Sequence, residues 1–144
     1  NYDVRWAHPY SVYDQLDWEV AVERPSIKGA DNYDRYRVRV EEMRQSLRIV
    51  EQAMEQMEPG DTMAKVRRIL RPPKGEVYMR TESPRGDFGV FLVSDGSDSP
   101  YRLKVRAPSF ANLQAIRHLL REAYVADAVV ILGSIDIVLG EVDR

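Results

Sequence analysis

The most regular pattern of hydrophobic and polar positions in this chain lies in residues 31–58. Apolar residues recur there at alternating steps of three and four, which is typical of one face of a long amphipathic helix. Asp31 can cap the first turn, and Pro59 and Gly60 favour an end to the helix. We predict that the apolar face packs in the core rather than forming a cofactor groove, and that the polar face meets solvent or a partner. The apolar face comprises Tyr33, Tyr36, Val40, Met43, Leu47, Val50, Met54 and Met57. The polar face comprises Arg35, Arg39, Glu42, Arg44, Gln45 and Glu51.

The preceding residues, 1–30, hold both tryptophans and are rich in tyrosine. Pro9 and Pro25 interrupt any long helix there, so the segment is expected to be extended. Apolar residues alternate with a period of two over residues 16–22, which predicts a short strand with one buried face. So much aromatic surface usually packs on something, either the core of the chain itself or further polypeptide.

Short β-prone runs follow the break at residues 72–75. Turn-forming residues separate the runs, and Gly96 favours a hairpin because glycine readily takes a positive φ. This spacing predicts an antiparallel meander within residues 76–106. The β-prone runs are residues 76–81, 89–94 and 101–106.

The remaining residues, 109–144, are predicted to contain helices and then a tail. Ser109 can cap a helix that reaches about Tyr124, and a second helix is expected over residues 125–132. The tail beyond Gly133 is expected to be irregular and packed inside an assembly. Together these elements predict an α+β fold in a single unit: a long amphipathic helix, a small antiparallel sheet and C-terminal helices.

Composition adds little to this picture. The 144 residues are 44% hydrophobic and could form one domain. The 21 basic and 23 acidic residues give a net charge of -2, so only the basic cluster at residues 65–71 could suggest nucleic acid, and a solvated surface or a partner contact explains it better. No apolar run reaches the roughly 18 residues needed to span a bilayer, and no signal peptide is recognised, so membrane association is expected to come through partners.

Residue types also limit the chemistry. The absence of cysteine excludes disulfides, thiolate catalysis and cysteine-held iron–sulfur clusters. His8 and His118 have no second ligand at helical spacing, so a metal site is not expected.

The roles of two charged residues remain open at this point. Arg85 could pair with Asp87 or Glu82 within its turn. Asp136 is a lone carboxylate in an apolar tail, where it could cap a backbone amide. In a dry cavity the same carboxylate would bind a proton more tightly and could take part in proton-coupled steps.

The last eleven residues, 134–144, resemble the metal-binding tail of nickel-iron hydrogenase large subunits, Ser-Phe-Asp-Pro-Cys-x-x-Cys-x-x-His. The Ser and Asp are retained, whereas a valine and a glutamate replace the two thiolates and an arginine replaces the histidine. Because a valine cannot donate an electron pair, we expect no metal here. The corresponding positions are Ser134, Asp136, Val138, Glu141 and Arg144.

A second motif, Glu-Ser-Pro-Arg-Gly-Asp-Phe-Gly at residues 82–89, resembles the hydrogenase segment Glu-Ala-Pro-Arg-Gly-x-x-Gly. Both motifs without the cysteines are the pattern of the hydrogenase-derived D subunit of respiratory complex I, the proton-pumping NADH:quinone oxidoreductase. Stretches within residues 31–46, 100–110 and 140–144 are similar to the same family. The family's chains are longer, so the resemblance identifies residues 1–144 with the C-terminal portion of the D subunit and implies a hydrogenase-large-subunit-like fold.

The resemblance implies a subunit of an enzyme that helps to form the quinone-reduction pocket. Electrons from NADH would arrive through iron–sulfur clusters on other subunits, so quinone would be a substrate here, and this chain would bind no metal or cluster and be inactive alone. Expected partners are the small subunit that carries the terminal iron–sulfur cluster and the membrane arm, with no nucleic acid. The chain would lie peripherally at the cytoplasmic face of the cell membrane, held by these partners.

The resemblance also implies roles for individual residues. It places Arg85 beside the former metal site and Asp136 near the quinone pocket, where we expect the Asp136 carboxylate to have a proton-coupled catalytic role. We expect Glu141 to pair with Arg144 rather than to face the cavity. The residues implied to line the quinone pocket are Arg85, Asp136, Val138, Val142 and Arg144.

Two other functions stay open at this point. The chain could be a non-catalytic scaffold whose cavity has closed. It could also be a D-like subunit of a related membrane complex that takes electrons from ferredoxin, because the residues that choose the donor lie on other polypeptides.

Overall fold

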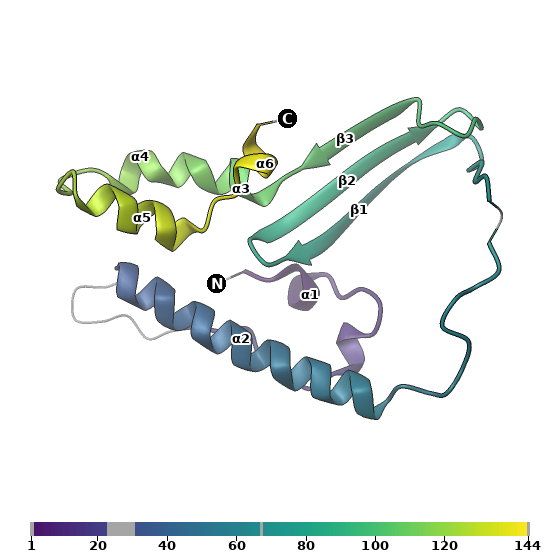
Figure 1. Ribbon diagram of the computed structural model, residues 1–144, viewed down its shortest axis with the longest axis horizontal. Helices are drawn as coiled ribbons and strands as arrows, with labels where there is room; N and C mark the ends of the chain where they lie inside the picture. Colours follow the sequence, from purple (N-terminus) through teal and green to yellow (C-terminus); the bar gives the residue numbers. More distant parts are fainter. Residues whose placement is uncertain (1, 23–30, 67, 144) are drawn as a thin grey trace.

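The computed structural model describes residues 2–22, 31–66 and 68–143 of the chain. A three-stranded antiparallel sheet lies on one side, a group of short helices continues from it, and the long helix α2 runs across the opposite side of the molecule (Figure 1). The α+β class is confirmed, with a long helix, a small antiparallel sheet and C-terminal helices. In chain order the elements are α1 (Val4–Ala7), η1 (Tyr13–Gln15), α2 (Asn32–Glu55), β1 (Gly75–Ser83), β2 (Gly86–Ser94), β3 (Arg102–Arg106), α3 (Pro108–Asn112), η2 (Leu113–Ala115), α4 (Ile116–Leu119), α5 (Asp127–Ile135) and α6 (Leu139–Val142).

The sheet is the predicted meander, with strand order β1-β2-β3. Strands β1 and β2 are longer than expected, because Ser83 pairs with Gly86 and leaves only Pro84 and Arg85 in the loop. Gly96 has the expected positive φ of 92°, but β3 starts only at Arg102, so this second connection is longer than a tight hairpin.

Asp87, on the central strand, ties the two outer strands together. Its carboxylate accepts hydrogen bonds from Nε and Nη2 of Arg80 on β1, at 2.9 and 2.6 Å. Nη1 of Arg106 on β3 lies 3.1 Å from the same carboxylate and donates to the Asp87 carbonyl at 2.6 Å. The hydrogen bonds from Arg80 lower the pKa of Asp87 below its ordinary value, so its charged form stabilises the sheet.

Helix α2 forms where the sequence predicts it. The Asp31 side chain caps it by accepting hydrogen bonds from the backbone N–H groups of Tyr33 and Asp34, at 2.9 and 3.0 Å. The helix ends at Glu55, slightly before Pro59 and Gly60.

The prediction for the faces of α2 is wrong. All the apolar positions of the stripe except Val40, which is half-buried, are between 51% and 74% exposed. Part of the polar face, namely Arg35, Arg39 and Gln45, turns toward the rest of the chain instead. Arg35 donates to the Ser134 hydroxyl at 3.0 Å, and Arg39 donates to the Ser134 carbonyl at 2.9 Å. The periodicity identifies a helix face correctly, but this chain does not supply the surface that would bury it.

The predicted strand at residues 16–22 is not formed. The backbone there is extended, but its polar groups bond to glutamine side chains of α2 rather than to another strand. Gln52 accepts from the Asp17 N–H at 2.8 Å and donates to the Asp17 carbonyl at 2.7 Å, while Gln45 accepts from the Glu19 N–H at 3.1 Å. Two glutamines therefore take the place of a neighbouring strand.

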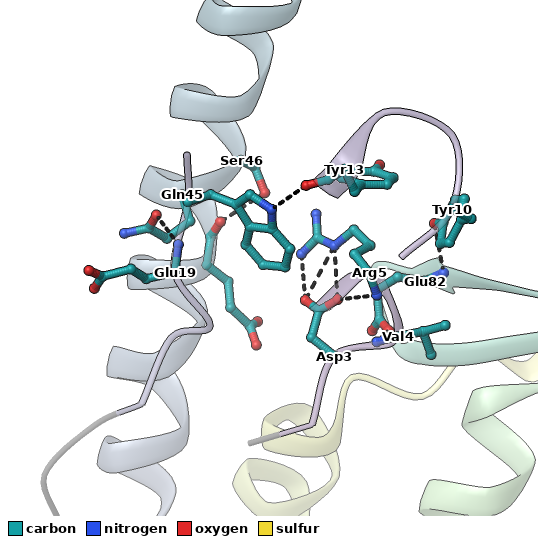
Figure 2. Close-up of polar contacts among 11 residues, drawn as sticks. Asp3, Val4, Arg5, Tyr10, Tyr13, Glu19, Gln45, Ser46 and Glu82 are labelled. Atoms are coloured by element: carbon teal, nitrogen blue, oxygen red, sulfur yellow. Dashed lines mark hydrogen bonds and ion pairs between the residues drawn. The ribbon is translucent and has the colours of Figure 1, made fainter. Parts of the chain in front are cut away.

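Residues near the N-terminus attach to both α2 and β1 (Figure 2). The Arg5 guanidinium bonds to Asp3, with Nη2 2.6 Å from the carboxylate, and lies 4.7 Å from the centre of the Trp18 ring. The Val4 N–H donates to the Glu82 carboxylate of β1 at 2.8 Å. Burial raises the pKa of Glu82, and Val4 beside it is 1% exposed, so this junction is one of the few closed regions among the described residues.

The C-terminal helices differ in detail from the prediction. The expected helix from Ser109 to about Tyr124 is shorter and changes to a 3₁₀ turn in its middle, and Pro108 in the first turn places the cap at Ala107. Ser109 is thus inside the helix. The second helix is confirmed as α5, and the tail is not irregular throughout, because it contains α6.

Few apolar side chains are buried within the described part of the chain. The aromatic and aliphatic surfaces of α2, of the sheet and of α5 remain open, so the chain does not enclose a core of the size its composition allows. No described helix is long and apolar enough to cross a bilayer. The buried hydrophobic residues are Val4, Ala21, Ala107, Ile131 and Ile135.

The open stripe of α2 makes a testable prediction about the isolated chain. Because apolar surface drives association and binds hydrophobic dyes, the purified chain should self-associate and enhance dye fluorescence. Substituting Leu47→Gln and Met54→Gln should reduce both signals without reducing helix content. Sedimentation, dye titration and circular dichroism would measure this, with Arg44→Gln as the control on an exposed polar position. A dye-silent monomer would contradict the exposed stripe.

The Asp87 contacts predict a pH-dependent contribution to stability. The folded-state pKa is lowered, so the stabilisation is present above the unfolded value of about 4 and is lost as the pH falls through the folded value. Asp87→Asn should lower the free energy of unfolding by about 1 to 3 kcal/mol at neutral pH, with a smaller difference at acid pH. Denaturant melts at several pH values would measure it, with the exposed Asp61→Asn as control. An equal loss at all pH values would show that charge is not responsible.

Candidate functional site

The structure brings Arg85 and Asp136 together. Arg85 lies in the loop between β1 and β2, and its Nε donates a hydrogen bond to the Asp136 carbonyl at 2.9 Å. The same nitrogen is 3.6 Å from the Asp136 carboxylate. The alternative pairing of Arg85 with Asp87 or Glu82 is not what the described residues show, because those carboxylates bond to Arg80 and to the Val4 N–H.

The backbone at the end of α5 presents Asp136 to this arginine. Asp136 follows the last helical residue and has φ 55° and ψ 55°, a left-handed conformation that aspartate and asparagine adopt more readily than most residues. The helix therefore stops at Asp136 and the chain turns back toward α3. The Asp136 carbonyl and carboxylate both face the Arg85 side chain as a result.

An open pocket of about 350 Å³ lies beside the pair. Its lining is apolar apart from Asp136, so it offers a hydrophobic surface with one charged group at its edge. The Asp136 side chain is 45% exposed, so the expected dry cavity is not formed by this chain alone. Asp136 is one of the residues that the family resemblance implies for a quinone pocket, and it lines the pocket found here. The lining residues are Leu113, Leu132, Gly133, Asp136, Ile137 and Leu139.

The other predicted tail residues are placed as follows. Val138 and Val142 are half-buried, and the Val138 N–H donates to the Ser109 hydroxyl at 3.4 Å. Arg144 lies outside the described residues, so its predicted pairing with Glu141 is not described either. Glu141 accepts a hydrogen bond from the Ser109 N–H at 3.1 Å and another from the Ser109 hydroxyl.

Sequence reasoning missed two polar residues of α3. A serine at position 109 favours a helix cap, although Pro108 in the first helical turn is the signal that places the cap one residue before the proline. Asn112 donates to the Arg85 carbonyl at 2.9 Å, and no local pattern in the sequence indicates that contact. Both Ser109 and Asn112 bond to segments far away in the sequence.

The arrangement can bind and polarise a carbonyl compound. A guanidinium donates several hydrogen bonds in a fixed planar geometry, and it stabilises negative charge that develops on an oxygen. Arg85 is about a quarter exposed, and among the described residues its terminal nitrogens have no hydrogen-bond acceptor. Within residues 2–22, 31–66 and 68–143, no three His, Asp or Glu side chains gather in a cluster that could hold a metal ion.

Comparisons with known proteins agree with the motifs. The D 2 subunit of NADH-quinone oxidoreductase from Solibacter usitatus is 49% identical over 99% of this chain and 38% of its own length. The D 1 subunit from Roseiflexus sp. is 53% identical over 99% of this chain and 39% of its length, and the D subunit from Geobacillus kaustophilus is 51% identical over 99% and 38%. The chain thus spans less than half the length of these relatives.

The family comparison covers the whole chain. Residues 1–72 and 66–144 match the family described as the respiratory-chain NADH dehydrogenase, 49 Kd subunit. The resemblance drawn from the two motifs is therefore confirmed, and the matched region corresponds to a C-terminal part of the relatives. This chain belongs to the 49 Kd subunit family of respiratory-chain NADH dehydrogenase, the family of the D subunits of NADH-quinone oxidoreductase.

Proposed function

We propose that this chain is part of a subunit of proton-translocating NADH:quinone oxidoreductase and helps to form the quinone-reduction pocket. The observation that carries the proposal is the contact between Arg85 and Asp136, two residues 51 positions apart that meet beside an apolar pocket. A quinone offers flat apolar surface and carbonyl oxygens, and this site offers an apolar lining and a hydrogen-bond donor. The names of the relatives, which specify NADH and quinone, support the same assignment.

In this mechanism Arg85 orients the quinone, and Asp136 takes part in a proton-coupled step. The guanidinium donates a hydrogen bond to a quinone carbonyl oxygen, and the interaction strengthens as electrons arrive and negative charge grows on that oxygen. The partly exposed Asp136 carboxylate lies next to the guanidinium that holds the substrate. The proposal takes the electrons from iron–sulfur clusters on other subunits, and the 144 residues of this chain include no cysteine to hold one.

The pocket of this chain alone is incomplete, and the proposal assigns the rest to partners. The pocket is open and Asp136 remains 45% exposed, so the small subunit with the terminal iron–sulfur cluster would close the site. The exposed apolar surfaces of α2 and α5 would be covered by the rest of a hydrogenase-large-subunit-like fold. The assembly, with its membrane arm, would hold the chain at the cytoplasmic face of the membrane.

Substitutions at the pair test this function in the complete complex. Arg85→Lys removes the Nε donor, and Asp136→Asn removes the charge beside it. Each should raise the Michaelis constant for a short-chain quinone, or weaken a quinone-site inhibitor, by about tenfold or more, as expected for loss of a hydrogen bond to a charged group. Val138→Trp, which enlarges a half-buried side chain of the same tail, should weaken inhibitor binding as well.

Two matched controls accompany these variants. Arg121→Lys and Asp61→Asn make the same chemical changes on exposed side chains and should leave quinone kinetics unchanged. Wild-type inhibitor sensitivity in all three pocket variants would contradict the quinone function and favour a scaffold.

Native mass measurement tests the proposed partners. When the tagged full-length subunit is purified from gently solubilised membranes, the chain should be recovered in a large particle that contains iron–sulfur and membrane subunits. Mass spectrometry of that particle would identify an NADH-oxidising or a ferredoxin-oxidising input module. Recovery as a small particle without iron–sulfur subunits would contradict the proposed assembly.

A further inference from the structure

Ser109 and Glu141 form a buried contact that the proposed pocket does not yet use. Ser109 is 1% exposed, and its N–H and hydroxyl both donate to the same carboxylate oxygen of Glu141. The hydroxyl oxygen also accepts a hydrogen bond from the Val138 N–H at 3.4 Å. One serine therefore joins α3 to two points of the C-terminal tail.

Beyond Val138, the described part of the tail has few buried apolar contacts. Helix α6 packs beside α3 (Figure 1), yet it has no buried residue, and its first residue, Leu139, is 78% exposed. Apolar burial therefore holds α6 only weakly. Hydrogen bonds to a carboxylate are shorter and stronger than those between neutral groups, and burial of Ser109 reduces competition from water. The Glu141 contact is thus an attachment of α6 that does not depend on apolar burial.

Helix α3 bonds to Arg85 itself and to the tail segment that follows Asp136. Ser109 and Asn112 are three residues apart, so they lie on the same side of α3. Asn112 donates to the Arg85 carbonyl at 2.9 Å, whereas Ser109 bonds to Val138, two residues beyond Asp136. A shift of the tail along α3 would change the distance between the Arg85 guanidinium and the Asp136 carboxylate.

We infer that Glu141, clamped on Ser109, is a positioning residue that sets the geometry of Arg85 and Asp136 in the quinone pocket. Glu141 does not touch the substrate; it fixes the tail that carries Asp136. This inference rests on the proposed function. It gives the glutamate a role distinct from pairing with Arg144 and from lining the cavity.

Variants of the complete complex test the contact between Ser109 and Glu141, which we call the clamp. Ser109→Ala removes the hydroxyl, and Glu141→Gln removes the charge while keeping the shape and an acceptor oxygen. Each should raise the Michaelis constant for a short-chain quinone by roughly fivefold to tenfold, with a smaller change in kcat. NADH oxidation by a hydrophilic acceptor that bypasses the pocket should stay unchanged per assembled complex. The double variant should show less than the sum of the two single effects, because both substitutions weaken the same bond between the Ser109 hydroxyl and the Glu141 carboxylate.

Hydrogen exchange gives a readout that does not depend on activity. The amide of Val138 donates to the Ser109 hydroxyl, so it should exchange faster in Ser109→Ala, and tail amides should exchange faster in Glu141→Gln. Glu122→Gln makes the same change on an exposed side chain and should alter neither exchange nor kinetics. If Ser109→Ala prevents assembly, Glu141→Gln still tests the inference.

The outcomes separate this inference from the proposed function. Faster exchange with an unchanged Michaelis constant would make the clamp purely structural and overturn the positioning role. Additive effects in the double variant would also overturn it. If Arg85→Lys alters quinone kinetics and the clamp variants do not, the clamp fails alone; if neither set does, the proposed function fails.

Discussion

Hydrogen bonds from side chains to distant backbone groups hold the segments of this chain together, because few apolar side chains are buried to do so. Arg39 reaches the Ser134 carbonyl of α5, and Arg85 reaches the Asp136 carbonyl. Each such bond from a charged guanidinium contributes about 1.5 to 3 kcal/mol on balance, since water competes for the same groups. The arrangement therefore depends on exclusion of water from these contacts. A chain built in this way acquires its full rigidity when neighbouring polypeptide covers its open apolar surfaces.

Local structure could be predicted from the sequence, but burial could not. Periodicity shows which residues share a face of α2, and the Asp31 cap locates its start, whereas the turn-forming residues mark the loops of the meander but not the ends of its strands. Whether a face is buried depends on the surface opposite it, which a local pattern does not contain. For α2 the apolar stripe predicts a face in the chain's own core, and the chain instead packs against the arginines and glutamines of the other face.

Only those residues of the candidate site that belong to one of the two motifs could be predicted from the sequence. The motifs name Arg85 and Asp136 together, although nothing in the spacing of residues 82–89 and 134–144 shows that they meet. The place of Ser109 is harder to predict because two local rules compete at its position: a serine favours a helix cap, and a proline before it favours the first turn. The proline determines the helix start, since its fixed φ suits that position, and the hydroxyl is left available to the tail.

The two glutamines of α2 that bond to the N-terminal segment also limit how the chain can change in length. Gln45 and Gln52 are separated by about 10 Å along the helix axis, and they meet Asp17 and Glu19 of an extended strand-like stretch. A one-residue insertion between these partners would leave one amide side chain and one backbone N–H unmatched. Surface segments usually tolerate insertions well, whereas this one is expected to keep a fixed length among functional homologues.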